Sequence, residues 1–152
     1  MANPTLDIVA QAIADTAVQA DSNLNGYPWL NPAPTTPAVC VNLETEMMER
    51  RTFREDMGGD WWRAWVLVDY IDSEESAINL LRYASSVGPL SIPEAFKPPT
   101  AAYRSVEGIS QIVWHGFGRV SGEFQGPSPI SFGGPDYWGV PLLFRAYIGY
   151  DR

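Results

Sequence analysis

The chain has little of what catalytic and metal sites are usually built from: one cysteine and one histidine among 152 residues. A single cysteine cannot form a disulfide within the chain, so nothing here requires an oxidising compartment. Cys40 stands in an apolar run, which favours a buried core residue over a thiol nucleophile. His115 lies near Trp114 and Phe117, where a structural histidine is commoner than a ligand. We therefore expect no metal site and no cofactor.

Positive charge is also scarce, with 10 Lys and Arg against 18 Asp and Glu and a net charge of −8. Binding to a phosphate backbone needs clustered cations, so this balance argues against a nucleic-acid-binding protein. No run approaches the roughly 20 apolar residues of a membrane span. The N-terminus lacks the basic and apolar regions of a secretory signal peptide. We expect no membrane association.

Catalytic motifs are missing as well. There is no Gly-x-Ser-x-Gly elbow and no phosphate-binding loop closed by Lys-Ser or Lys-Thr, and Gly116-x-Gly118 lacks the third glycine of a dinucleotide turn. The acidic pair Glu74 and Glu75 is explained by the dipole of the helix that it opens. We expect no catalytic residues and no enzymatic activity.

The residues that are present predict one folded domain over 1–152, because 45% are hydrophobic and 12% aromatic. The most informative stretch is 61–86, where a β-branched and aromatic run meets a helix start almost without a loop. Asp72 can cap this helix and Glu75 stands at the capping-box position. One helix face is expected to be apolar, formed by Ala77, Leu80, Leu81 and Ala84.

Periodicity and turn residues place the other elements. We expect a helix over 4–20, a Pro-rich loop over 21–37 with Tyr27 and Trp29 packed on the domain, and a strand over 38–44. Further along we expect a short helix opened by a Ser91–Glu94 capping box and strands over 109–120 and 138–148. The glycines within 109–120 indicate a bulge or a close approach of another backbone. Pro141 and Arg145 suggest that the last strand is an edge strand or is bulged. The predicted class is α+β: a mostly antiparallel four-stranded sheet with two main helices, a short helix and long loops.

Two segments are candidates for contacts with other proteins. Residues 45–60 are predicted to form a charged, projecting arm, with a solvated connector as the alternative. Residues 121–137 are predicted to form a long loop rich in Gly, Pro and Ser. Apolar side chains expected to be exposed along them are Met47, Met48, Phe53 and Met57 in the arm and Phe124, Ile130 and Phe132 in the loop.

Tryptophans concentrate at the start of the strand that begins near residue 61. Trp62 shares a strand face with alanine and valine side chains, and Trp65 shares the opposite face with Leu67. Apolar residues on both faces imply cover on both sides, by helices or by another subunit. This pattern favours a core or interface role over a sugar-binding or base-stacking platform.

The order and texture of these segments resemble the tail terminator proteins of long-tailed bacteriophages, particularly those of actinobacteria. The resemblance spans nearly the whole chain. It lies in the N-terminal helix, the Pro-rich loop before Thr36-Pro37-Ala38-Val39, the strand-helix unit, the segment Gly88-Pro89-Leu90-Ser91-Ile92, and the closing strand around Tyr137-Trp138-Gly139-Val140. The arm and the long loop depart from that family pattern.

The resemblance implies a non-enzymatic virion protein that assembles in the host cytoplasm. Such proteins form a ring, usually of six subunits, that caps the tail tube and joins it to the head-side connector while DNA passes through. For this chain we hypothesise that Glu46, Glu49 and Glu55 face the channel. The alternatives are another neck protein, such as a connector or stopper, and a small carbohydrate-binding or hydrolase domain that uses the tryptophans.

Overall fold

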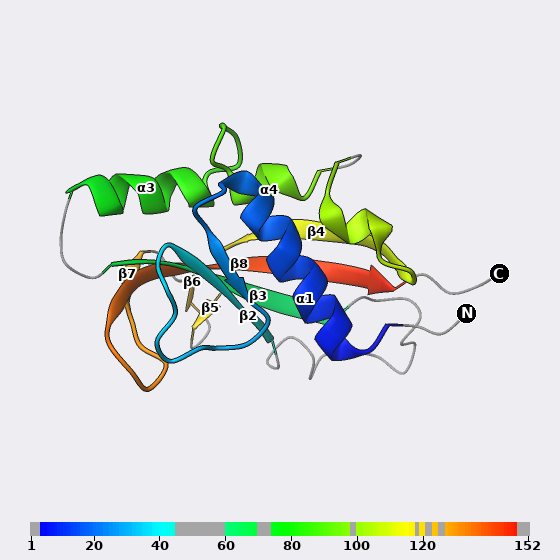
Figure 1. Cartoon of the computed structure of the whole chain (residues 1–152), viewed down its shortest axis with the longest axis horizontal. Coiled ribbons are helices and arrows are strands. Elements are labelled where there is room, and N and C mark those ends of the chain that lie inside the picture. The colour runs from blue at the N-terminus through cyan, green and yellow to red at the C-terminus, as the bar shows by residue number, and fades with distance from the viewer. Residues whose placement is uncertain are drawn as a thin grey trace.

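A computed structural model describes residues 4–44, 60–69, 74–97, 100–117, 119–120, 123–124 and 127–148. For 119–120 and 123–124 it describes the backbone alone. The class is α+β, as the sequence predicts, with helices gathered on one face of a sheet (Figure 1).

In the described residues the main sheet has six strands and is mixed. The strand order is β1-β2-β3-β8-β4, and β7 pairs with the first residues of β8. Strand β1 runs parallel to β2, and the other neighbouring pairs are antiparallel. The bounds are β1 Asn25–Tyr27, β2 Ala38–Leu43, β3 Asp60–Asp69, β4 Ile109–Phe117, β7 Ser128–Ile130 and β8 Tyr137–Ile148; β5 (Arg119–Val120) and β6 (Glu123–Phe124) form a separate two-stranded sheet.

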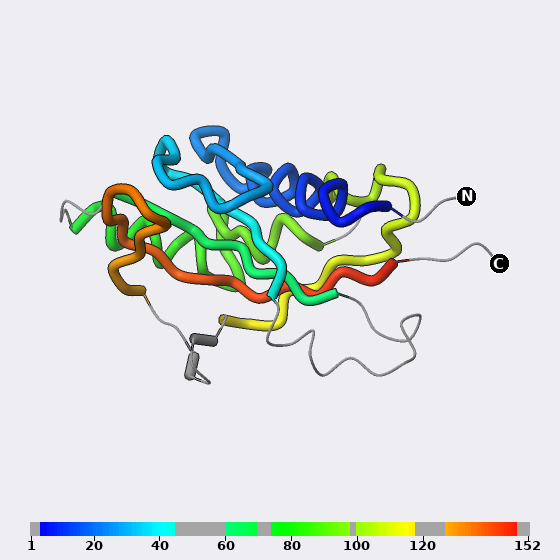
Figure 2. The backbone as a smooth tube through the Cα atoms, turned by 90° about the horizontal axis from the view of Figure 1, so that it is seen from below, coloured from blue at the N-terminus to red at the C-terminus, as the bar shows by residue number. Residues whose placement is uncertain are grey.

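Strands β3 and β8 form the centre of the sheet, and their side chains alternate between its two faces. One face of both strands belongs to the main core, through Trp62, Ala64, Val66 and Val68 on β3 and Val140, Leu142, Phe144 and Ala146 on β8. The helices pack on this face, and Figure 2 shows α1 above the strands. Their bounds are α1 Leu6–Ala17, followed by the 3₁₀ turn η1 Val18–Ala20, then α3 Glu74–Ala84, α4 Ile92–Ala95 and the 3₁₀ turn η2 Ala102–Ser105.

Two predictions that depend on residues close together in sequence, a helix cap and a bulge, are confirmed. The Ser91 hydroxyl accepts a hydrogen bond from the Glu94 N–H at 3.0 Å, which caps α4. Gly116 has a φ of 94°, and the register of β4 on β8 shifts between Trp114 and Phe117. The glycine therefore supplies the bulge that the sequence predicts, since a positive φ suits glycine.

The expected four-stranded, mostly antiparallel sheet is wrong. The two additional strands β1 and β7 are three residues long and come from segments that resemble loops in composition. Three residues cannot display a two-residue alternation, so their pairing leaves no signal in the sequence. Gly139 admits β7, because a Cβ there would lie 2.6 Å from Leu67 Cδ2 and 2.9 Å from Ile130 Cδ1.

The edge position suggested for the last strand is also wrong, because β8 lies between β3 and β4. Pro141 is opposite Trp65 of β3 on one side. On the other side, the β7 partners end at Gly139 and the β4 partners begin at Leu142. A central strand tolerates proline best where a neighbouring ladder is already interrupted, and Pro141 lies at this interruption.

Helix α3 is rotated from its predicted orientation. Leu80 and Ala84 are buried as expected, but Tyr83, 3% exposed, takes the place expected for Leu81. The predicted face included Ala77 and Leu81, and both are exposed. Tyr83 is drawn inward because its hydroxyl donates a hydrogen bond of 2.6 Å to Asp21, at the end of the segment that follows α1. An apolar stripe on the outer side of α3 is left uncovered.

Candidate functional site

Among the residues that the structure describes, the second face of the main sheet is covered at one end only. There a smaller core of Ala38, Cys40, Trp65, Leu67, Ile130 and Tyr137 lies beneath Tyr27, Leu30 and Phe132. The cover that the sequence predicts for both faces of β3 is therefore supplied on this side by the end of β1 and by loop residues of the same chain. Burial raises the pKa of the Cys40 thiol to about 11, so this thiol stays protonated and unreactive at neutral pH.

The other end of the same face carries a different set of side chains, which we call the outer-face cluster: Trp61, His115, Arg145 and Tyr147. Register brings them together from three strands, because Trp61 of β3 and Val113 of β4 both pair with Arg145 of β8. The Arg145 guanidinium carbon lies 4.9 Å from the centre of the Trp61 ring and 5.1 Å from that of Tyr147. The rings of Trp61 and His115 meet edge to face at 4.9 Å.

The charge of Arg145 has no opposite partner among the described residues. Its Nε is buried and makes no hydrogen bond there. On the same face Arg63 forms an ion pair with Glu44 and lies 5.2 Å above the Trp65 ring. Arg63 and Arg145 thus both lie beside aromatic rings, but among the described residues only Arg63 has a carboxylate beside it.

His115 adds a titratable group to the cluster. Burial, and then the neighbouring charge of Arg145, lower its pKa from the ordinary value of 6.5. Among the described residues, no carboxylate is recorded beside this imidazole to orient it as in a catalytic histidine. The cluster is thus suited to holding an anionic group between aromatic rings rather than to moving protons.

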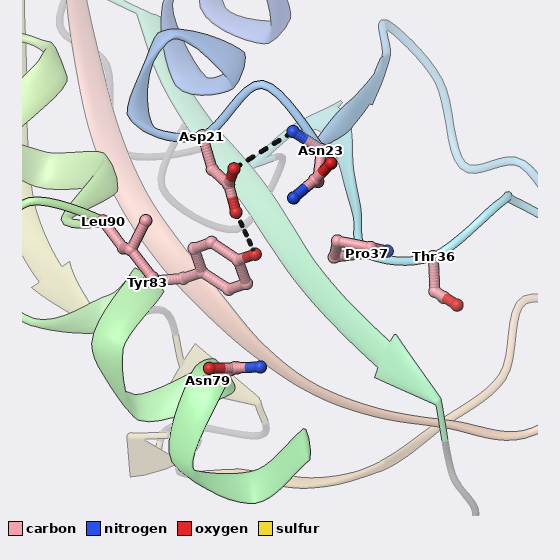
Figure 3. Close-up of a pocket in the computed structure, with 7 residues that line it drawn as sticks. All are labelled: Asp21, Asn23, Thr36, Pro37, Asn79, Tyr83 and Leu90. Atoms are coloured by element: carbon pink, nitrogen blue, oxygen red, sulfur yellow. Dashed lines mark hydrogen bonds between the residues drawn. The ribbon is translucent and has the colours of Figure 1, made fainter. Parts of the chain in front are cut away.

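A polar groove lies on the helical side of the sheet, between α3 and the chain that follows α1 (Figure 3). Its volume is about 610 Å³, and its lining is Asp21, Asn23, Thr36, Pro37, Asn79, Tyr83 and Leu90. The Asp21 carboxylate accepts hydrogen bonds from the Tyr83 hydroxyl at 2.6 Å and the Asn23 N–H at 3.1 Å. Burial, with the Asp21 carboxylate second, raises the pKa of Tyr83.

The groove has polar groups but no reactive pair. Its carboxylate Asp21 is already bonded through both oxygens, and nearby Asp69 accepts from the Thr36 hydroxyl. In the described parts of the chain, no three His, Cys, Asp or Glu side chains are grouped closely enough to hold a metal ion. Neither Cys40 nor His115 lines the groove. Its arrangement stabilises the packing of α3 on the sheet.

Of the residues predicted for partner contacts, one is buried, one packs on the smaller core, and the side chains of the others lie outside the described residues. Ile130 was expected to be exposed, and this is wrong: it is 8% exposed in the smaller core. Phe132 packs on the same core and meets the Trp65 ring edge to face at 5.6 Å. The Phe124 side chain lies outside the described residues, as do Met47, Met48, Phe53, Met57, Glu46, Glu49 and Glu55.

The tryptophan and loop predictions have mixed outcomes. Trp62 is 3% exposed and Trp65 is 8% exposed, so both are core residues as predicted. Tyr27 packs on the smaller core as expected, whereas Trp29 is 54% exposed and the expectation that it packs is wrong. The outer-face cluster was missed, although the alternation of β8 already places Arg145 and Tyr147 away from the main core.

No protein-family model, no curated protein and no solved structure matches this chain. None of the helices in the residues that the structure describes is both long and apolar enough to cross a membrane.

Proposed function

We propose that this chain is a structural, ring-forming virion protein of a long-tailed bacteriophage, a tail terminator. The observation that carries the proposal is the second face of the sheet, which the described residues cover at one end only. Its open end presents partly exposed aromatic side chains around a cation, and aromatic residues and arginine are enriched in protein–protein contacts. A surface of this kind on a small domain suits repeated contact with another copy.

The groove gives little support to an enzyme. Hydrolysis needs a nucleophile and a base within hydrogen-bond reach, or two carboxylates on either side of a substrate. Among its described lining residues the groove has one carboxylate, Asp21, which accepts hydrogen bonds from Tyr83 and Asn23. A structural role requires neither a nucleophile with its base nor a pair of carboxylates.

In this proposal the partners are further copies of the chain, the tail tube protein and the head-side connector. The ring closes on the end of the tube, and DNA passes through it without sequence-specific contacts. The net charge of −8 supports the last point, because an acidic channel repels the phosphate backbone. Another neck protein, a connector or stopper, is the alternative that shares the same ring architecture.

A carbohydrate-binding or hydrolase domain is less well supported. It would need the tryptophans to line a concave polar site. No tryptophan lines the groove of Figure 3, and Trp62 is 3% exposed beneath the helices. The tryptophans and the polar groove, which such a site would have to combine, therefore lie in different parts of the molecule.

Absolute mass in solution tests the proposal. Light scattering over a wide concentration range, with negative-stain images of the same samples, is expected to reveal a closed ring of about six subunits with a central hole. Soluble tail tubes added to the sample are expected to acquire the ring at one end. A strict monomer at every concentration that also fails to bind tubes would overturn the proposal.

A further inference from the structure

Helix α3 carries a second uncovered surface, which we call the α3 stripe: Glu74, Ala77, Ile78 and Leu81. These positions are spaced i, i+3, i+4 and i+7, so they follow one side of the helix. All four are exposed, Ile78 by 40% and Leu81 by 56%. The stripe therefore begins with a carboxylate and continues with apolar side chains.

The outer-face cluster has the complementary composition. Its centre is a cation that the rings of Trp61 and Tyr147 hold in place, with no carboxylate beside it among the described residues. Aromatic side chains surround the charge and remain partly exposed. An isolated arginine between aromatic rings fits a carboxylate with an apolar neighbour better than it fits a nucleic acid, which needs several clustered cations.

The two surfaces lie at opposite ends of the molecule. The cluster is near the first residue of β3, and α3 follows the last residue of that strand. In Figure 1 the start of α3 is at the far left, and the end of β8, which carries Arg145 and Tyr147, points to the right. One copy therefore cannot satisfy both surfaces by contacting itself.

We propose that the α3 stripe of one copy docks on the outer-face cluster of the next, with Glu74 paired to Arg145. This inference rests on the proposed function and names the contact that builds the ring. The contact is heterologous, because two different surfaces meet, and repetition of such a contact generates a ring when its rotation closes. A second copy is the fitting partner because it presents the exposed Glu74, and a chain with 18 acidic and 10 basic residues has carboxylates in excess of cations.

Charge reversal tests the pairing. Arg145→Glu and Glu74→Arg are each expected to raise the concentration of half-association by about tenfold or more, because each places like charges together. The double variant is expected to recover most of the wild-type association. Glu75→Arg is the matched control: it makes the same charge change in the same helical turn, but about 100° around the helix from Glu74, and it should associate like the wild type.

Thiol trapping provides a test that does not depend on the folding of Arg145→Glu. Ile78→Cys and Gln111→Cys are made as separate chains; Gln111 is exposed and pairs with Tyr147 on the cluster face. Under mild oxidation a mixture is expected to form a disulfide-linked pair containing one chain of each kind. The native Cys40 should not interfere, because it is fully buried and its pKa is about 11.

The outcomes separate this contact from the proposed function. A ring that persists in both charge variants, with no mixed disulfide, would overturn the contact and leave the ring standing. A monomer that binds no tail tubes and forms no mixed disulfide would overturn both. A mixed disulfide together with loss and rescue of association would establish the contact.

Discussion

At the scale of single residues, burial and neighbours give chemically similar side chains different roles. Arg63 and Arg145 both lie against tryptophan rings on one sheet face, yet within the described part of the chain only Arg63 has a carboxylate partner, Glu44. The neighbour of Arg145 is instead His115, whose pKa is lowered by burial and by that positive charge. Burial and, after it, the nearby positive charge thus both favour the neutral form of this histidine.

This arrangement predicts a specific dependence of stability on pH. Because the pKa of His115 is lower in the folded chain, the unfolded chain takes up a proton first as the solution is acidified. The histidine's contribution to stability is complete above a pH of about 6.5 and is lost as the pH falls below it. His115→Gln should remove this part of the slope.

Urea unfolding midpoints of the wild type and His115→Gln, measured between about pH 5 and 8, check the prediction. The carboxylates are common to both chains, so their contribution cancels in the difference. A difference that stays constant, or one in which the wild type gains stability on acidification, would contradict it.

At the scale of elements, buried polar groups join segments that are far apart in the chain. Thr16 of α1 is fully buried; its hydroxyl donates to the Ala12 carbonyl at 2.7 Å and accepts from the Tyr103 N–H at 3.0 Å. Gln19 adds a second connection, since its side chain bonds the backbone of Thr100 and Ala102. These bonds attach η2 to α1 and so position the start of β4.

We expect Thr16→Val to lower the free energy of unfolding by about 1–3 kcal/mol, because the buried Tyr103 N–H loses its acceptor while the shape is kept. Chemical denaturation followed by circular dichroism measures the change. Thr16→Ser keeps the hydroxyl and serves as the control, with a smaller loss from the missing methyl group. Equal stability of Thr16→Val and the wild type would show that the hydroxyl does not hold η2.

At the scale of the whole molecule, two unlike surfaces lie at the two ends of an elongated domain. The sheet spans its length, the helices cover one face, and the other face is covered by the chain's own described residues at one end only (Figure 2). Opposite charges at the two ends favour head-to-tail association over a symmetric pair, because two identical ends would bring like charges together.

Association is therefore expected to weaken with salt. Raising the salt concentration from about 0.1 M to about 1 M shortens the screening length from about 10 Å to about 3 Å, so the concentration of half-association should rise. Sedimentation velocity measures it. Glu74→Gln is the control: it should associate more weakly than the wild type and respond less to salt. Association that strengthens with salt would instead indicate a contact held by apolar burial alone.

Much of the fold is determined by the sequence alone, since its signals act over a few residues. The helix predicted over 4–20 is present as α1 and the 3₁₀ turn η1 over 6–20, and the cap at Ser91 and the bulge at Gly116 are present too. Helix caps and residue periodicity predict these features because the interacting groups are neighbours along the chain. The α+β class follows from the same signals.

The tertiary structure decided what depends on residues far apart in the sequence. The pairing of β1 and β7 and the inward turn of Tyr83 depend on contacts with distant segments. The outer-face cluster joins Trp61, His115 and Arg145, which no short window of sequence contains. The sequence alternation assigns Arg145 to the face opposite the main core, but strand register alone determines which side chains surround it.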